Sequence, residues 1–254
     1  MKFLIGNLKM NLISPKEREN YWEGFNNCLL GRNFKNVAVV LCPPFVHAEA
    51  FKRKIKSEFV FFGGQNIFFE EKGRFTGEVS APMIKNFCGD FVIIGHSERR
   101  RLFNEDGDLI NKKIKSALKN ELVPIFCIGE TAVERSSGEI KRVISDQLLA
   151  GLAEINPEKL TDIIIAYEPI WSIGSGQVPT ADEIMEVRIL IQKVLRDYSG
   201  LAMDELPKIL YGGSVDFRNI KSLCLDPGMD GVLVGGESLH PIDFIKIGEV
   251  LENN

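Results

Sequence analysis

The amino-acid sequence predicts an α/β protein in which residues 1–254 form one domain, a closed (β/α)8 barrel of eight parallel strands surrounded by helices. Three observations predict it. Eight short apolar runs recur along the chain, stretches with helical periodicity separate them, and polar or glycine residues follow nearly every run at its C-terminal end. A length of 254 residues also suits such a barrel, which commonly needs about 250.

The apolar runs are rich in β-branched residues and do not alternate with polar ones, as expected of parallel strands that are covered on both faces. In chain order they are Phe3–Ile5, Val37–Leu41, Phe59–Phe62, Phe91–Ile94, Leu122–Ile128, Ile163–Tyr167, Ile209–Tyr211 and Val232–Val234.

Helix start and stop signals stand between the runs. Ser14 and Glu17 flank Pro15 in the pattern of a capping box, and Gly31 stands where that helix would stop. Thr180 and Glu183 form a second capping box, ahead of an apolar stripe with helical spacing. Further amphipathic helices are predicted around 110–118 and 140–149.

An open, doubly wound sheet could also hold eight strands. The barrel is favoured because unusual residues follow nearly every run, and only in a closed barrel do all these strand ends converge on one mouth, where barrel enzymes place their sites. No linker-like segment or low-complexity stretch divides the chain.

Composition excludes several classes of function. A net charge of -4 gives no long-range attraction for nucleic acid or an anionic membrane surface. No apolar run approaches the roughly 18 residues of a membrane-spanning helix. The five cysteines are odd in number and lack metal-ligand spacing, which favours reduced thiols. We therefore expect a soluble cytoplasmic protein with no metal site.

Glu168 directly follows the run Ile163–Tyr167 and precedes a long loop, Pro169–Pro179. Strand-to-helix loops usually take about two to six residues, and longer ones tend to be lids or binding loops. A carboxylate at the root of a lid is a candidate general base. Taken alone, a glutamate at this position would more often be a helix cap or a surface ion-pair partner.

Lys9 and His96 follow two other runs. A lysine past a strand end is commonly just solvated, but Lys9 lies between Asn7 and Asn11, where an ammonium group could bind phosphate and polarise a carbonyl. A single histidine is often structural. Gly95 permits close approach before His96, and Ser97 could cap a helix behind it, whose N-terminus would keep the imidazole neutral.

Glycine pairs follow the last two runs, at Gly212–Gly213 before Ser214 and at Gly235–Gly236. Either pair alone would indicate a tight turn. Together they stand where barrels build a phosphate site from backbone amides and a short helix. Neither pair matches a nucleotide-binding fingerprint.

With these residues in view, the chain resembles triosephosphate isomerase over its full length. The segments that carry the resemblance are Gly6–Asn11, Gly64–Asn66, Phe75–Glu78, Gly95–Arg100, Cys127–Glu130, Ala166–Gly176, Tyr211–Val215 and Leu233–Gly236.

The resemblance implies a TIM barrel that interconverts dihydroxyacetone phosphate and D-glyceraldehyde 3-phosphate through an enediolate, in glycolysis and gluconeogenesis, without a metal or organic cofactor. Its implied roles are a base, a proton shuttle, a positive charge, an orienting amide and an acidic neighbour of the lysine, and these fall on Glu168, His96, Lys9, Asn7 and Glu98. Asn7 and Lys9 would also contact the substrate. Phosphate would be held by Gly174, Ser214, Gly235 and Gly236.

The resemblance also implies a homodimer. The long segment 65–80, with Thr76 at its tip, matches a loop that inserts into a second subunit. Its phenylalanines at 68, 69 and 75 would be partly exposed in a monomer.

Some residues depart from the usual family pattern. Leu8 replaces a tryptophan, Ser172 and Ser175 replace Ala and Thr, and the lid ends in Gln177-Val178-Pro179. Glu237 follows Gly236 where a small residue is usual, and we expect its side chain to turn outward. Two rival readings stay open at this point: a phosphosugar barrel with another substrate, and a catalytically silent phosphate-binding protein.

Overall fold

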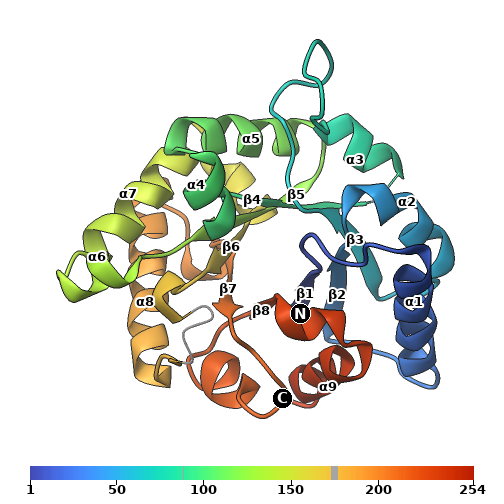
Figure 1. Ribbon diagram of the computed structural model, residues 1–254. Coiled ribbons are helices and arrows are strands. Elements are labelled where there is room, and N and C mark those ends of the chain that lie inside the picture. The colour runs from blue at the N-terminus through green and yellow to red at the C-terminus, as the bar shows by residue number, and fades with distance from the viewer. Residues whose placement is uncertain (88, 173–176) are drawn as a thin grey trace.

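The computed structural model describes residues 1–87, 89–172 and 177–254, with only the backbone described at residue 87. Eight parallel strands close into a barrel in sequence order, so the first strand pairs with the second and with the eighth (Figure 1). The predicted closed barrel is confirmed. The strands are β1 (Lys2–Asn7), β2 (Val37–Cys42), β3 (Val60–Gly64), β4 (Phe91–Ile94), β5 (Val123–Ile128), β6 (Ile164–Tyr167), β7 (Lys208–Gly213) and β8 (Gly231–Val234).

Helices surround the barrel (Figure 1). The α-helices of the described residues are α1 (Pro15–Leu29), α2 (Phe45–Lys54), α3 (Ala81–Phe87), α4 (Ser97–Phe103), α5 (Gly107–Lys119), α6 (Ala132–Ser136), α7 (Ile140–Leu152), α8 (Ala181–Ser199) and α9 (Pro241–Glu252). Short turns of other helix types are η1 (Pro157–Asp162), η2 (Ile170–Ser172), η3 (Met203–Glu205), η4 (Lys221–Leu225) and η5 (Gly236–Leu239).

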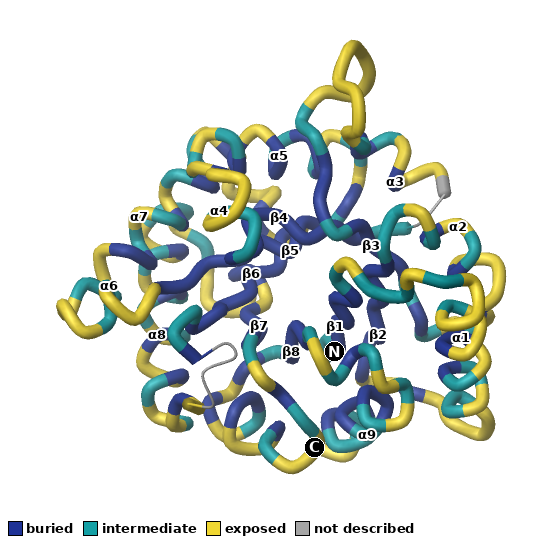
Figure 2. Tube along the Cα trace, viewed as in Figure 1, coloured by how far each residue is buried: buried dark blue, intermediate teal, exposed yellow. Residues whose placement is uncertain are grey.

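The strands divide the core into two apolar clusters. On β2, Val39 and Leu41 pack in the large cluster toward the helices, whereas Val40 and Cys42 belong to a smaller second cluster. This alternation follows from the period of two along a strand, and it repeats on the other strands. The small cluster therefore fills the barrel interior, and the buried tube of Figure 2 follows the strands. The barrel is a packed scaffold that leaves function to its mouth.

The helix starts agree with the sequence in part. Thr180 and Glu183 form the complete capping box predicted for α8. At α1 the Ser14 side chain accepts from the Glu17 N–H, but the Glu17 carboxylate accepts from Ile13 instead of Ser14. The reciprocal half of that predicted box is therefore displaced by one residue.

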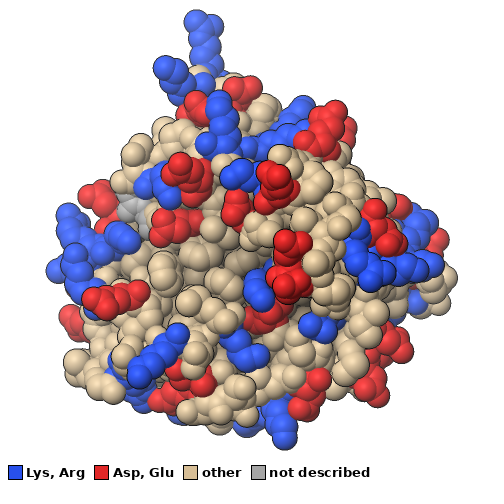
Figure 3. Space-filling model, turned by 180° about the vertical axis from the view of Figure 1, so that it is seen from behind, with Lys and Arg blue, Asp and Glu red and all other residues tan. Residues whose placement is uncertain are grey.

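The face turned away in Figure 1 mixes charges. Figure 3 shows Lys and Arg side chains interspersed with Asp and Glu over this face, without a broad area of one sign. No helix among the described residues is long and apolar enough to span a membrane. Within the same part of the chain, no cluster of His, Cys, Asp and Glu side chains has the arrangement of a metal site.

Candidate active site

The C-terminal ends of the strands bring the predicted site residues together around one cavity of about 310 Å³. Asn7 ends β1, Lys9 and His96 lie just past β1 and β4, and Glu168 directly follows β6. Glu98 does not line the cavity but contacts Lys9, which does. Gly174 lies outside the described residues, as do Ser175 and Gly176. The lining residues are Asn7, Lys9, His96, Glu168, Val178, Gly212, Gly213, Ser214, Val215, Asp216, Asn219, Leu233, Val234, Gly235, Gly236 and Glu237.

Lys9 is held in an uncommon backbone conformation. Its φ of 49° lies in the left-handed region, which non-glycine residues enter mainly where their surroundings hold them there. The Lys9 N–H donates to Asn7 Oδ1 at 3.0 Å, and the Gln65 side-chain amide donates to the Lys9 carbonyl at 2.9 Å. These bonds direct the side chain toward the cavity. The role of Gln65 could not be read from the sequence, because its partners are backbone carbonyls.

The Lys9 ammonium group forms an ion pair with Glu98, with Nζ 2.6 Å from Oε1. Partial burial of the Glu98 carboxyl raises its pKa, but the hydrogen bond from Lys9 and the positive charge of that lysine lower it. The pKa of Glu98 therefore lies below its ordinary value. Glu98 positions the lysine and keeps a compensating charge beside it.

His96 corrects one prediction: it is itself the N-cap of α4, and Ser97 is the first helical residue. The Glu98 N–H donates to His96 Nδ1 at 3.2 Å, so Nδ1 carries no proton. The proton of the imidazole is then on Nε2, which lies 3.1 Å from Glu168 Oε1. This geometry gives Nε2 an N–H that faces Glu168 at the cavity.

Gly95 makes this turn possible. Its φ is +72°, and a Cβ at this position would lie 3.0 Å from Ile110. Arg100, largely buried, donates to the Gly95 carbonyl at 2.8 Å and to the Cys127 carbonyl at 3.0 Å. Burial lowers the pKa of Arg100 from its very high ordinary value. Arg100 thus ties the His96 turn to the end of β5, a contact that the sequence did not reveal.

Glu168 is 4% exposed and makes two contacts across the barrel mouth. Oε2 accepts the Ser97 N–H at 3.0 Å, and Oε1 faces His96. Gly212 leaves room beside it, since a Cβ there would lie 2.9 Å from the Glu168 Cγ. The carboxylate is therefore positioned from β4, β6 and β7 together.

The opposite rim is lined by the glycines of β7 and β8. Ser214 follows Gly213, and η5 begins at Gly236. A Cβ on Gly235 would lie 3.3 Å from Lys9 Cε and 3.7 Å from its Nζ, so Lys9 lies against this glycine. This rim, comprising Ser214, Gly235 and Gly236, is called the cradle below.

Ser238 fastens the cradle to β1. Its buried hydroxyl lies 3.2 Å from the Asn7 carbonyl and 2.5 Å from the Gly235 carbonyl. The buried Tyr21 hydroxyl of α1 donates to the Ser238 carbonyl at 2.9 Å. Neither residue carries a sequence signal, because a lone serine and a helical tyrosine occur in many structural settings.

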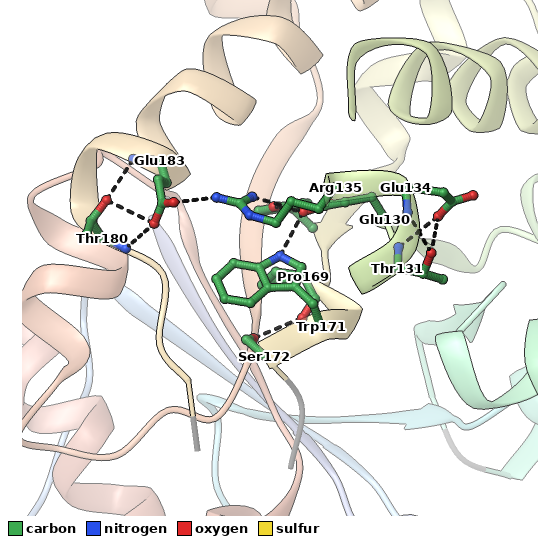
Figure 4. Close-up of polar contacts among 10 residues, drawn as sticks. Glu130, Thr131, Glu134, Arg135, Pro169, Trp171, Ser172, Thr180 and Glu183 are labelled. Atoms are coloured by element: carbon green, nitrogen blue, oxygen red, sulfur yellow. Dashed lines mark hydrogen bonds and ion pairs between the residues drawn. The ribbon is translucent and has the colours of Figure 1, made fainter. Parts of the chain in front are cut away.

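The root of the long loop is anchored by Glu130, which is fully buried (Figure 4). Its Oε1 accepts from Trp171 Nε1 at 2.8 Å and from the Tyr167 hydroxyl at 3.1 Å, and it lies 3.3 Å from Arg135. Figure 4 shows Arg135 extending from this group to Glu183 of the α8 capping box. Both ends of the loop are thus joined through one arginine.

The structure shows the surroundings of two residues that depart from the usual pattern, Leu8 and Glu237. Leu8 is fully buried in the core. Glu237, whose side chain we expected to turn outward, is half-buried and belongs to the residues that line the cavity.

The mouth of this barrel combines a buried carboxylate, an imidazole and an ammonium group with a glycine-lined rim. Barrel enzymes place their catalytic groups at this mouth, so the fold and the site together define an enzyme. A sequence model of the family described as triosephosphate isomerase matches residues 2–251. Proteins named triosephosphate isomerase include one from Dictyoglomus turgidum, 39% identical over 97% of this chain and 98% of its own length. Others come from Carboxydothermus hydrogenoformans, 41% identical over 96% of each chain, and Clostridium tetani, 44% identical over 82% of each. The chain belongs to the triosephosphate isomerase family, and the resemblance stated from the sequence is confirmed.

Proposed function

We propose that this protein is an isomerase that interconverts dihydroxyacetone phosphate and D-glyceraldehyde 3-phosphate. The observation that carries the proposal is a family match over residues 2–251 in a chain whose Lys9, His96 and Glu168 line one cavity. From the family we assign the reaction to glycolysis and gluconeogenesis.

In the proposed reaction Glu168 removes a proton from the carbon next to the carbonyl, which leaves an enediolate and a neutral carboxylic acid. The same group returns the proton to the neighbouring carbon, so no oxidant or reductant is needed. A general base of this kind typically contributes about 10²–10⁴-fold to the rate. The Ser97 N–H and His96 Nε2 hold the Glu168 carboxylate in place at the cavity.

His96 donates from Nε2 to the substrate oxygens and moves a proton between them. Lys9 supplies positive charge near the developing oxyanion, where a fixed charge stabilises the transition state. We assign Asn7 to orienting Lys9 and the substrate, and Glu98 to positioning the ammonium group; their contacts are compatible with these roles.

The phosphate dianion is proposed to bind at the cradle, through backbone amides and the Ser214 hydroxyl, with Gly174 of the lid completing the site. Amides at a short helix start are suited to an anion. We propose that no metal or organic cofactor takes part, and the reaction as written needs none.

We further propose a homodimer in which the Thr76 loop inserts into a second subunit. Exposed large apolar side chains follow every strand, and those after β1 to β4 lie in the part of the barrel that carries the loop, where a second chain would cover them. The loop itself projects from the barrel (Figure 1). These exposed residues are Met10, Ile13, Val46, Phe75, Leu102 and Phe103.

Sedimentation of the protein at micromolar concentration tests this proposal. A dimer is expected, and removal of the loop tip between Glu71 and Thr76 should give monomers with much reduced activity. A monomer in the intact protein would refute it.

We place the protein in the cytoplasm, as one domain spanning residues 1–254, with triose phosphates as its small-molecule partners and no nucleic-acid or membrane partner. The mixed charges of the face in Figure 3 and the net charge of -4 are compatible with this proposal.

A coupled spectrophotometric assay with either triose phosphate tests the proposed activity. Turnover in both directions, insensitive to a metal chelator, is expected. Binding of a phosphate-bearing analogue without turnover would favour the silent phosphate-binding protein. Turnover of another phosphosugar alone would favour the rival enzyme.

A further inference from the structure

Taken together, the charged residues that line the cavity do not favour the binding of an anion. Among the described lining residues there is one lysine, Lys9, against three carboxylates, Glu168, Asp216 and Glu237. The lysine is already paired with Glu98, 2.6 Å away. A ligand that carries a phosphate dianion therefore meets more negative than positive charge at this mouth.

Two of the three carboxylates are engaged by neighbours. Glu168 accepts from Ser97 and faces His96. Asp216 accepts from the Arg218 guanidinium at 2.6 Å and from the backbone N–H groups of Arg218 and Asn219. These bonds, the side-chain bond from Arg218 first, hold the pKa of Asp216 below its ordinary value.

Glu237 differs from both. Within the described part of the chain, no Lys, Arg or His nitrogen lies within 4.0 Å of its carboxylate. It nevertheless lies near enough to Arg218 to contribute, after Asp216, to the raised pKa of that guanidinium. Glu237 is also next in sequence to Gly236 of the cradle, and both residues line the cavity.

Position makes this charge effective. Glu237 is half-buried, and a partly shielded charge acts on its neighbours more strongly than one in open water. Glutamate carries a negative charge at neutral pH. The backbone amides of the cradle carry only partial positive charges. A full negative charge beside them therefore changes the affinity of the cradle for anions.

From these observations, and resting on the proposed function, we propose that Glu237 is a specificity-determining residue: its carboxylate weakens binding at the cradle in proportion to the negative charge of the ligand. The cradle then discriminates less strongly between a phosphate ester and a singly charged ester than its amides and Lys9 alone would. Glu237 thereby lowers the affinity of the cradle for the phosphate group, which favours release of product and reduces inhibition by free phosphate.

The test compares two ligands of the same shape in Glu237→Gln and in the wild type. Glycerol 3-phosphate is a dianion at about pH 8, because a phosphate ester loses its second proton near pH 6, whereas glycerol 3-sulfate carries one negative charge. Calorimetric titration should show about 3- to 10-fold tighter binding of the phosphate in Glu237→Gln and a gain of about 2- to 3-fold for the sulfate, as expected for one nearby charge. Both gains should shrink as salt is added.

Glu186→Gln is the matched control. Glu186 is exposed on α8 and does not line the cavity, so this substitution removes the same charge away from the cradle. It should bind both ligands as the wild type does. Glu237→Ala must shift affinity in the same direction as Glu237→Gln, which keeps the test independent of one side chain's packing.

Equal gains for both ligands, no gain for either, or the same gains in Glu186→Gln would each overturn the proposal. The titrations need no turnover, so they can fail while the wild type still isomerises triose phosphates. Conversely, a wild type that binds phosphate but does not isomerise would remove the proposed function and leave the charge discrimination intact.

Discussion

The two sides of the cavity are built by different means. On the side of β4 and β6, side chains hold one another: Lys9 pairs with Glu98, and His96 and Ser97 hold Glu168. On the side of β7 and β8, the cradle is mostly backbone, fastened from behind by Ser238 and Tyr21. Groups that move protons need fixed ionisation and direction, whereas a group that binds phosphate needs amides and space. Substitutions should therefore reduce turnover on the first side and shift affinity on the second.

The largest effect is expected for Glu168→Gln. The amide can still accept from Ser97, so the site should keep its shape while the base is lost. We expect kcat to fall by about 10³-fold, within the range typical of general acid–base groups. Affinity for a phosphate-bearing analogue should stay within a few-fold of the wild type. Turnover near that of the wild type would exclude Glu168 as the base.

Lys9→Met should affect both turnover and affinity, because Lys9 contacts both sides of the cavity. It pairs with Glu98 and lies against Gly235. We expect weaker binding of a phosphate analogue together with a fall in kcat of about 10²-fold, since one charge serves both the phosphate and the oxyanion. Steady-state kinetics and calorimetry measure the two effects separately. Lys16→Met, an exposed position on α1, is the control. Analogue affinity and turnover that both match the control would remove Lys9 from the site.

The smallest effect concerns the stability that the Lys9–Glu98 pair contributes. The pKa of Glu98 is lowered in the folded protein, so its stabilising contribution is fully present above the ordinary glutamate pKa and is lost as pH falls through the lower, folded value. Wild type should exceed Glu98→Gln in free energy of unfolding by up to about 1 kcal/mol at neutral pH. Urea titrations should show this difference shrinking below about pH 4. A difference that stayed constant with pH would mean that the pair does not stabilise the charged carboxylate.

Much of this architecture could be predicted because it depends on local patterns. Apolar runs such as Phe91–Ile94 and Ile163–Tyr167 became strands, and the Thr180–Glu183 box began α8. The positions of Lys9, His96 and Glu168 around one cavity followed from barrel closure, which brings all strand ends to one mouth.

What the sequence could not predict depends on contacts between distant segments. Gln65 holds the carbonyl of Lys9, and Arg100 joins Gly95 to Cys127, through bonds to backbone atoms that every residue possesses. The cap of α4 was assigned to Ser97 because serine usually caps by its own side chain. His96 takes that position instead, since its Nδ1 can reach the Glu98 N–H.

The pairing of β1 with β8 makes closure of the barrel depend on a strand that is synthesised long after β1. A growing chain that stops before Gly231 exposes an unpaired edge on β1 and another on β7, and such edges invite pairing with other chains. The same missing segment carries Gly235, Gly236 and Ser238. A nascent chain therefore closes the barrel and completes the cradle together, and until then its open strand edges favour aggregation.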